Sequence, residues 1–298
     1  MNHQRARRFA TWGVLLVLVA LLVVAVRRLD VARVSAELRV VRGGWVALAL
    51  CAYLALLPLW GAQWHLLAPR TARNTFRRML GLVAMASSTH STTAFFMGEA
   101  TSAVLLSTQV GLAGSEVVSV IAMDQLLVGL AKLAVLLTAA LTLTLPEWLT
   151  AGIVTLASGV TALLVVTVLG AWHADRILAR VGGMLPPRGA RALSGMGQAL
   201  APLRTPRRGG VALVLGLVKM VAEVAAIICI QRAFGVRLPA ASAVLVLAAT
   251  QMATLIPLVP ANLGVYEGAI VLIYTRLGLP TELAVGMAVV QHAASFAA

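Results

Sequence analysis

Six ionisable side chains lie inside long apolar stretches of this sequence. They are Glu99, Asp124, Lys132, Lys219, Glu223 and Glu267. A charged side chain at the centre of a membrane helix costs at least about 2.5–3.5 kcal/mol, so its presence there calls for a partner or a function. Carboxylates and ammonium groups held away from water can bind a polar group of opposite charge or exchange a proton. These residues are therefore the first candidates for chemistry.

Glu99 and Glu267 are the strongest of these candidates. Each lies beside a glycine, Gly98 and Gly268, and each begins an apolar stretch that we expect to form a half-helix. A carboxylate near a helix N-terminus is stabilised by the helix dipole and by free backbone amides. The two glutamates therefore either cap their own helices or bind a cationic or hydroxyl-bearing group.

The remaining charged candidates are spaced so that they can pair. Lys219 and Glu223 are four residues apart and share a helix face. For this pair, a role in fixing helix packing and a functional role both stay open. Asp124 and Lys132 are eight residues apart, on roughly one helix face. For them, structural pairing is the favoured interpretation.

Three further polar residues lie near interruptions of the apolar stretches. His90 belongs to a hydroxyl-rich run over 87–93, Asn262 follows a proline-bracketed break, and Gln251 precedes that break. His90 either contacts a ligand or, as we favour, helps to satisfy broken backbone at a hairpin tip. We expect Asn262 to cap exposed amides and Gln251 to line a cavity wall.

The composition indicates which elements position these residues. Of the 298 residues, 60% are apolar and 11% are charged, and the mean hydropathy is +0.94. Soluble domains have about 45–50% apolar and about 25% charged residues, so we predict an all-α polytopic membrane protein. The net charge of +14 is better explained by membrane topology and an anionic lipid surface than by nucleic acid.

The sequence contains no motif of a hydrolase, metalloprotease or nucleotide-binding enzyme. Its two cysteines are far apart and have no metal-binding spacing. We therefore expect neither an enzyme nor a bound metal or cofactor.

Uninterrupted apolar stretches predict about six full spans, at 9–26, 44–67, 117–145, 148–171, 211–234 and 282–298. Three arginines precede the first span, four lie in 69–78 and seven lie in 172–210. The positive-inside rule places all three segments in the cytoplasm. The interrupted stretch 79–110 must then enter the membrane and return to the same side, as a re-entrant helical hairpin.

A second interrupted stretch, 238–277, has the same character. Pro257 and Pro260 bracket its break, and each removes a backbone donor and disfavours a continuous helix. Broken backbone at membrane depth is tolerated only when it is buried in protein or lines a wet cavity. We expect a second re-entrant hairpin here, entering from the opposite side. The segment 27–43, which carries five arginines, is expected to lie in the membrane interface as an elbow.

The two interrupted regions also resemble each other in sequence. Both 99–116 and 267–282 read Glu, an apolar stretch, Gly-Leu, a short turn, and a Ser-Glu or Thr-Glu pair. The arginine distribution independently places the two copies on opposite sides. An inverted repeat with broken helices is typical of transporters.

The segment 257–268 carries a family resemblance. It reads Pro-Leu-Val-Pro-Ala-Asn-Leu-Gly-Val-Tyr-Glu-Gly and resembles the Pro-x-x-Pro-Gly-x-Leu-Gly-x-x-Glu-Gly signature of the lysylphosphatidylglycerol synthase transmembrane (flippase-like) family. The hopanoid-associated membrane proteins belong to that family. Ala222-Glu223 and Gly98-Glu99 are similar to further elements of it, and the resemblance extends from about residue 10 to the end of the chain.

Some positions depart from the family pattern. Ala261 stands where the family usually has Gly, and Thr101 and Ser102 stand where Arg is common. Gln291-His292 also occupies a place often held by Arg. The loss of these cations argues against a phosphate clamp in the first hairpin.

The resemblance implies that the chain translocates a lipid or lipid-linked intermediate between membrane leaflets. The implied partners are membrane phospholipids or polyprenyl- and hopanoid-type lipids, and a homo-oligomer stays open. We expect a multi-pass protein of the cell (inner) membrane with its N-terminus in the cytoplasm. Two alternatives are a membrane lipid transferase that uses Glu99 and Glu267, and a non-transporting scaffold of a lipid-synthesis complex.

The expected organisation is a single transmembrane flippase-like domain over 1–298. It contains hairpins at about 79–110 and 238–277 and a cytoplasmic loop at 172–210.

Overall fold

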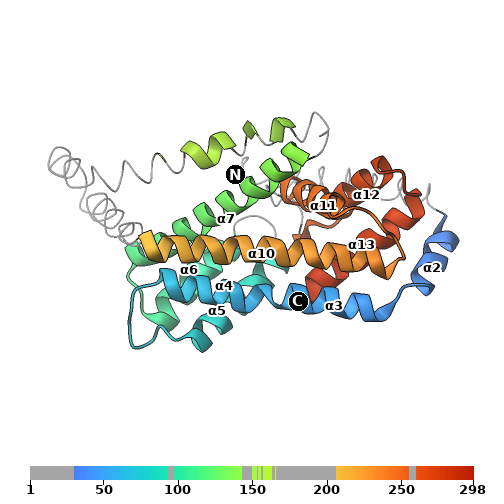
Figure 1. Cartoon of the computed structure of the whole chain (residues 1–298). Helices are drawn as coiled ribbons and strands as arrows, with labels where there is room; N and C mark the ends of the chain where they lie inside the picture. Colours follow the sequence, from blue (N-terminus) through green and yellow to red (C-terminus); the bar gives the residue numbers. More distant parts are fainter. Residues whose placement is uncertain are drawn as a thin grey trace, which may run out of the picture.

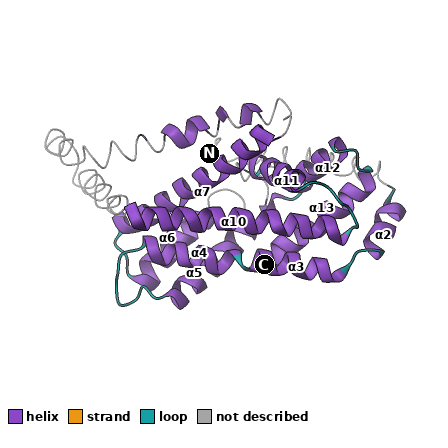
Figure 2. Ribbon diagram, in the orientation of Figure 1, coloured by secondary structure: helices purple, strands orange, loops and turns teal. Residues whose placement is uncertain are grey.

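The computed structural model describes residues 30–92, 97–142, 150–152, 154–155, 157–162, 165, 206–254 and 260–298. Every regular element among these residues is a helix (Figure 2), which confirms the predicted all-α class. The predicted span at 9–26, much of 148–171 and most of the loop at 172–210 lie outside the described residues. The number of spans therefore stays a prediction.

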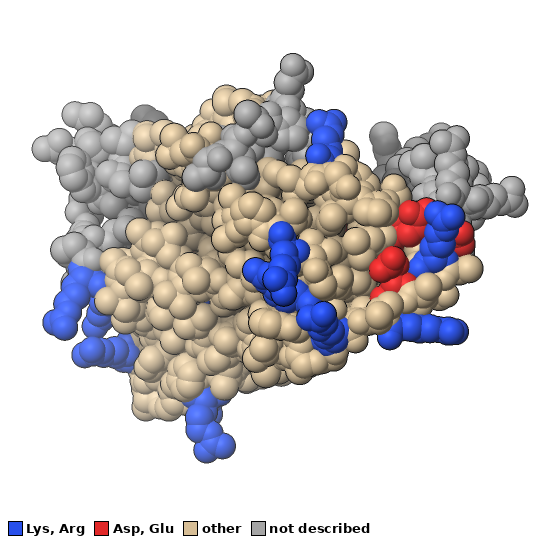
Figure 3. Space-filling view, turned by 45° about the vertical axis from the view of Figure 1, so that its right-hand side comes forward, with Lys and Arg blue, Asp and Glu red and all other residues tan. Residues whose placement is uncertain are grey.

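Three long helical segments run side by side through the described part of the protein (Figure 1). They are α3 (Gly43–Leu54) continued by α4 (Leu56–Leu67), α7 (Gly114–Thr142) and α10 (Pro206–Ala233). Their apolar stretches are 25, 28 and 27 residues long, and about 20 apolar residues suffice to cross a bilayer. On the face seen in Figure 3, the few charged side chains are scattered over a surface of uncharged residues. The chain is a membrane protein.

Between α3 and α4 the helix is interrupted at Ala55. Pro58 explains the interruption, because it has no N–H and its ring would clash with the carbonyl of Leu54 in a continuous helix.

The first interrupted region forms a helical hairpin, which we call hairpin one. Its elements are α5 (Phe76–Thr92), α6 (Met97–Leu105) and the π-helix η1 (Leu106–Val110). α5 packs against α6. At the base of the hairpin, Nη1 of Arg78 donates a hydrogen bond to the carbonyl of Gln109 at 3.3 Å. Gly111 then ends the helix in the left-handed conformation, with φ of 75°. Hairpin one therefore begins and ends at the same place.

The second interrupted region forms hairpin two. Its elements are α11 (Ala240–Ala253), the 3-10 turn η3 (Pro260–Asn262) and α12 (Val265–Arg276). Nε2 of Gln231, near the end of α10, donates hydrogen bonds to the hydroxyl of Ser242 at 3.0 Å and to that of Tyr274 at 3.3 Å. Ser242 lies at the start of α11 and Tyr274 near the end of α12. Hairpin two therefore also begins and ends at one place, beside the C-terminal end of α10.

The break in hairpin two contains a left-handed turn. Ala261 and Asn262 have φ values of 56° and 52°. This conformation costs a residue with a Cβ roughly 1–2 kcal/mol, although asparagine adopts it more readily than most. The side chain of Asn262 makes no hydrogen bond with a described residue, and because 255–259 lie outside the described residues, its capping role stays a prediction. Pro257 lies outside the described residues.

Two further helices are α2 (Val31–Arg39) and α13 (Thr281–Ala297), which pack against each other. The carboxylate of Asp30 caps α2 by accepting a hydrogen bond from the backbone N–H of Arg33 at 3.1 Å. The segment that we expected to be an interfacial elbow thus contains a capped helix.

The hairpins occupy opposite ends of the long helices (Figure 1). Hairpin one shares a buried core with α4 and the N-terminal part of α10, represented by Leu106 and Ala212. Hairpin two shares a second core with α3, α13 and the C-terminal part of α10, represented by Ile230 and Ile273. Leu130 of α7 packs against both cores. The turn η3 of hairpin two contacts α5 of hairpin one, so the two hairpins meet between the ends.

Candidate functional site

Four charged side chains form a row between α7 and α10, which we call the charge row. Asp124 and Lys132 come from α7, and Lys219 and Glu223 come from α10. Electrostatic interactions connect Asp124 with Lys219, Lys219 with Glu223, and Glu223 with Lys132. Two of the groups are acidic and two are basic, so the row is neutral as a whole. This balance lowers the cost of placing charges among apolar residues.

The charges in the row interact without direct ion pairs. The ion pairs within 4.0 Å among the described residues lie elsewhere in the chain. The arrangement differs from the predicted pairing of Asp124 with Lys132. Eight residues of helix separate these two by about 12 Å along the axis, and the neighbouring α10 offers each of them a partner of opposite charge.

At one end of the row, Asp124 meets the tryptophans of α4. The indole N–H of Trp60 donates a hydrogen bond to Oδ2 of Asp124 at 3.2 Å. Nζ of Lys219 lies 5.8 Å from the centre of the Trp60 ring, within the range of a cation–π contact. Trp64 packs edge-on against Trp60, with ring centroids 5.6 Å apart. Asp124 is 3% exposed and Lys219 is 8% exposed, so this end of the row is closed to bulk water.

Hairpin one brings Glu99 and His90 together. Oε2 of Glu99 lies 3.9 Å from Nδ1 of His90. Gly98 permits this approach, because a Cβ at that position would fall on the imidazole ring of His90. His90 also interacts electrostatically with Asp124. Glu99 is therefore connected to the charge row through His90.

Toward the other end of the row, Glu223 meets hairpin two. Nε2 of Gln251, in α11, donates a hydrogen bond to Oε2 of Glu223 at 2.9 Å. Tyr53 of α3 and Tyr266 of α12 are also close enough to interact electrostatically with Glu223. Gln251 and the tyrosines thus continue the run of polar groups from α10 into hairpin two.

Both carboxylate oxygens of Glu267 have partners. Oε2 accepts a hydrogen bond from the backbone N–H of Gly264 at 2.7 Å, so Glu267 caps α12. Oε1 lies 2.6 Å from Nδ1 of His292 in α13. The His292 ring lies 4.6 Å from the ring of Tyr266, whose hydroxyl accepts a hydrogen bond from Nε2 of Gln291 at 3.0 Å.

The half of the site near hairpin one holds buried polar atoms that have no hydrogen-bond partner among the described residues. They are Nε2 and Oε1 of Gln63, Oε2 of Glu99, Nε1 of Trp64 and Oδ1 of Asp124. The Trp64 and Asp124 side chains lie next to each other, just beyond hydrogen-bond distance, so the clearest open positions are those of Gln63 and Glu99. Near hairpin two, Oε1 of Gln291 is also buried and has no hydrogen-bond partner among the described residues. A buried polar atom without a partner costs about 1–3 kcal/mol. The first half therefore offers several open hydrogen-bonding positions to water or to a polar ligand.

Three hydroxyl side chains of the run around His90 form hydrogen bonds within α5. The hydroxyls of Ser88, Thr89 and Thr92 donate to backbone carbonyls one turn earlier in α5, at 2.9, 3.0 and 2.7 Å. Such bonds are common for hydroxyl residues inside helices. His90 faces Glu99, and because 93–96 lie outside the described residues, its favoured role in satisfying the hairpin tip stays a prediction.

Four residues of the site were not predicted from the sequence: Tyr53, Trp60, Gln63 and Trp64. Trp60, Gln63 and Trp64 are spaced by three and four residues, which places them on one face of α4. That spacing is a signal that could have identified them, whereas Tyr53 carries no such signal. Among the described residues, no three His, Cys, Asp or Glu side chains converge as ligands for a metal.

Comparison with curated proteins and with solved structures found no match. Comparison with protein families matched residues 11–298 to the family described as "Lysylphosphatidylglycerol synthase TM region". The match includes both hairpins and the whole charge row, and it confirms the resemblance seen in the segment 257–268. The chain therefore belongs to the lysylphosphatidylglycerol synthase TM region family, whose domains are membrane-associated and lipid-related.

Proposed function

We propose that the protein translocates a lipid or lipid-linked intermediate between the two leaflets. The observation that supports this is the run of polar side chains through apolar helices from hairpin one to hairpin two. In order, its members are Glu99, His90, Asp124, Lys219, Glu223, Gln251, Tyr266, His292 and Glu267. A lipid headgroup must leave water to change leaflets, and charge in the bilayer centre is costly. Fixed partners along the way lower that cost while the acyl chains stay in lipid.

The alternation of charge in the row matches a headgroup that carries both signs. Lys132 and Lys219 can bind a phosphate, and Asp124 and Glu223 can bind an ammonium or hydroxyl group. Each of these groups already has a protein partner of opposite sign. A headgroup can therefore exchange partners stepwise without leaving an uncompensated charge behind. Membrane phospholipids and polyprenyl- or hopanoid-type lipids with such headgroups are the proposed substrates.

The arginine-rich segment 69–78 sets the proposed orientation. It connects α4 to hairpin one, and by the positive-inside rule it faces the cytoplasm. Hairpin one then opens toward the inner leaflet of the cell membrane and hairpin two toward the outer leaflet. The N-terminus lies in the cytoplasm in this arrangement.

Glu267 has a fixed place at the hairpin-two end of the polar run. Its two oxygens are bonded to Gly264 and His292, which holds the carboxylate at the start of α12 as part of the polar run between the hairpins. We propose a transporter and not an enzyme.

The test is leaflet exchange of labelled lipids in proteoliposomes, with native lipid extract as the source of test lipids. We expect the wild type to speed exchange and Glu99→Gln to slow it about tenfold or more, because a loss of 1.4 kcal/mol at the barrier gives a factor of ten. Glu282→Gln is the matched control, since Glu282 begins α13 outside the polar run.

Exchange that Glu99→Gln slows and Glu282→Gln leaves unchanged would support the proposal. Equal rates in all three proteins would remove Glu99 from the path. Absence of exchange for every lipid fraction would overturn translocation and favour the scaffold alternative.

A further inference from the structure

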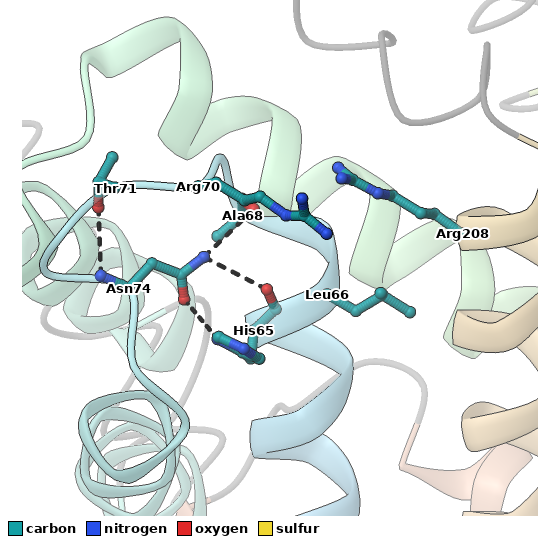
Figure 4. Close-up of a pocket in the computed structure, with 7 residues that line it drawn as sticks. All are labelled: His65, Leu66, Ala68, Arg70, Thr71, Asn74 and Arg208. Atoms are coloured by element: carbon teal, nitrogen blue, oxygen red, sulfur yellow. Dashed lines mark hydrogen bonds between the residues drawn. The ribbon is translucent and has the colours of Figure 1, made fainter.

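A separate pocket of about 310 Å³ lies at the arginine-rich end of the long helices (Figure 4). Ligand pockets have volumes from about 300 Å³ upward. This one is formed by the end of α4, the loop that follows it and the first turn of α10, and its polar lining includes His65, Arg70, Asn74 and Arg208. Lys219 follows Arg208 by 11 residues on α10, which is about 16 Å of helix. The pocket is therefore distinct from the charge row.

Two guanidinium groups point toward each other in this pocket. Figure 4 shows the side chains of Arg70 and Arg208 converging from the loop and from α10. Neither makes a hydrogen bond or ion pair with a described residue, and the pocket lining contains no Asp or Glu. Like charges so placed repel each other unless an anion lies between them. The planar guanidinium fork matches the oxygens of a phosphate.

Asn74 holds the loop of the pocket in place. Its side chain is buried, and Nδ2 donates to the carbonyls of His65, Ala68 and Pro69 at 3.3, 3.3 and 2.9 Å. Because Nδ2 is thereby fixed as the donor, Oδ1 accepts from Nδ1 of His65 at 2.8 Å. The Nδ1 atom of His65 then carries the proton, and Nε2 stays free of this network. The loop that carries Arg70 is thus preorganised, which reduces the entropy lost on binding.

We propose that this pocket binds a phosphate group between Arg70 and Arg208, with His65 at its edge. The source of the phosphate is an anionic lipid headgroup of the facing leaflet or free phosphate. Binding in this pocket does not require that the chain move lipids. Its use as the first binding position of a transported lipid rests on the proposed function.

The experiment measures binding to the purified full-length chain in neutral detergent. The probe is dioctanoyl phosphatidylglycerol, with dioctanoylglycerol as the phosphate-free comparison and inorganic phosphate as competitor. The pocket variant carries Arg70→Gln and Arg208→Gln. The matched control carries Arg77→Gln and Arg207→Gln, which remove the same charge from exposed positions at the same end.

We expect the affinity for the probe to fall at least about tenfold in the pocket variant and less than about threefold in the control, because hydrogen bonds to a charged group are strong. Equal losses in the two variants, no loss in the pocket variant, or equal binding of dioctanoylglycerol would overturn the proposal. Displacement of the probe by inorganic phosphate would support recognition of phosphate alone. Failure of displacement, with loss in the pocket variant, would support recognition of the lipid headgroup. Leaflet exchange tests translocation, and probe binding tests the phosphate pocket. Because the two measurements are separate, either proposal can fail without the other.

Discussion

The two hairpins place a glutamate beside a glycine and next to a histidine, yet they use the carboxylate differently. In hairpin two, Glu267 is bonded through both oxygens, to the start of α12 and to His292 at 2.6 Å. In hairpin one, Oε2 of Glu99 is buried without a hydrogen bond to a described residue, and the nearest nitrogen of His90 is 3.9 Å away. One glutamate is committed to structure, whereas the other keeps an open acceptor.

The difference arises from where each histidine lies. His292 comes from α13, a separate helix that packs closely against α12. His90 comes from α5 within the same hairpin, and its ring occupies the space above Gly98. Similar local sequences therefore do not predict similar roles, because the partner is supplied by helix packing.

The largest expected effect comes from breaking the charge row, which connects the two hairpins. Lys219→Met leaves Asp124 and Glu223 without the cation between them, and removing one partner from a buried charged group costs about 3–5 kcal/mol. We expect a loss of this size in the free energy of unfolding, measured in mixed detergent micelles with a denaturing detergent. The double variant Lys219→Met, Asp124→Asn restores neutrality and should recover at least half of the loss. A single-variant loss below about 1 kcal/mol would indicate that water solvates the row.

The next effect separates the two glutamates directly. Glu267→Ala removes a helix cap and a hydrogen bond between His292 and a carboxylate, and we expect it to lower the free energy of unfolding by about 2–3 kcal/mol. Glu99→Ala should change it by less than about 1 kcal/mol, because that carboxylate gains little from its surroundings.

A double-mutant cycle sharpens this comparison. The coupling between Glu267 and His292 should exceed the coupling between Glu99 and His90 by about 1 kcal/mol or more. Equal coupling energies would mean that each histidine interacts equally strongly with its glutamate. That result would contradict the difference between the hairpins.

The last comparison concerns the glycine beside each glutamate. Gly98→Ala puts a methyl group where the His90 ring lies, and we expect a loss of about 1–3 kcal/mol from overpacking. Gly268→Ala has open space around it and lies inside α12, so it should be neutral or gain up to about 1 kcal/mol. Thermal unfolding of the two variants checks this. Adding His90→Ala to Gly98→Ala should restore the stability that Gly98→Ala loses. If it does not, the added methyl group clashes with a residue other than His90.

Much of the fold was predictable because its signals are local. The long apolar stretches predicted α3–α4, α7 and α10 to within a few residues. The interrupted stretches predicted that each of these regions forms two separate helices, since prolines and polar runs disfavour a continuous apolar helix. That the hairpins re-enter the membrane stays a prediction. The segment of α2 was less clear, because its helix depends on a cap at Asp30 and on packing against α13.

The sequence by itself determined the helical class, the family, and which side chains are too costly in a membrane to lack a partner or a function. Composition, apolar run length and short motifs carry that information without any knowledge of neighbours. Only the tertiary structure decided the partners. Trp60 meets Asp124 across 64 residues of chain, Gln251 meets Glu223 across 28, and His292 meets Glu267 across 25. These contacts depend on which helix faces pack together, and one membrane helix is as apolar as another, so their pairing leaves no signal in a single sequence.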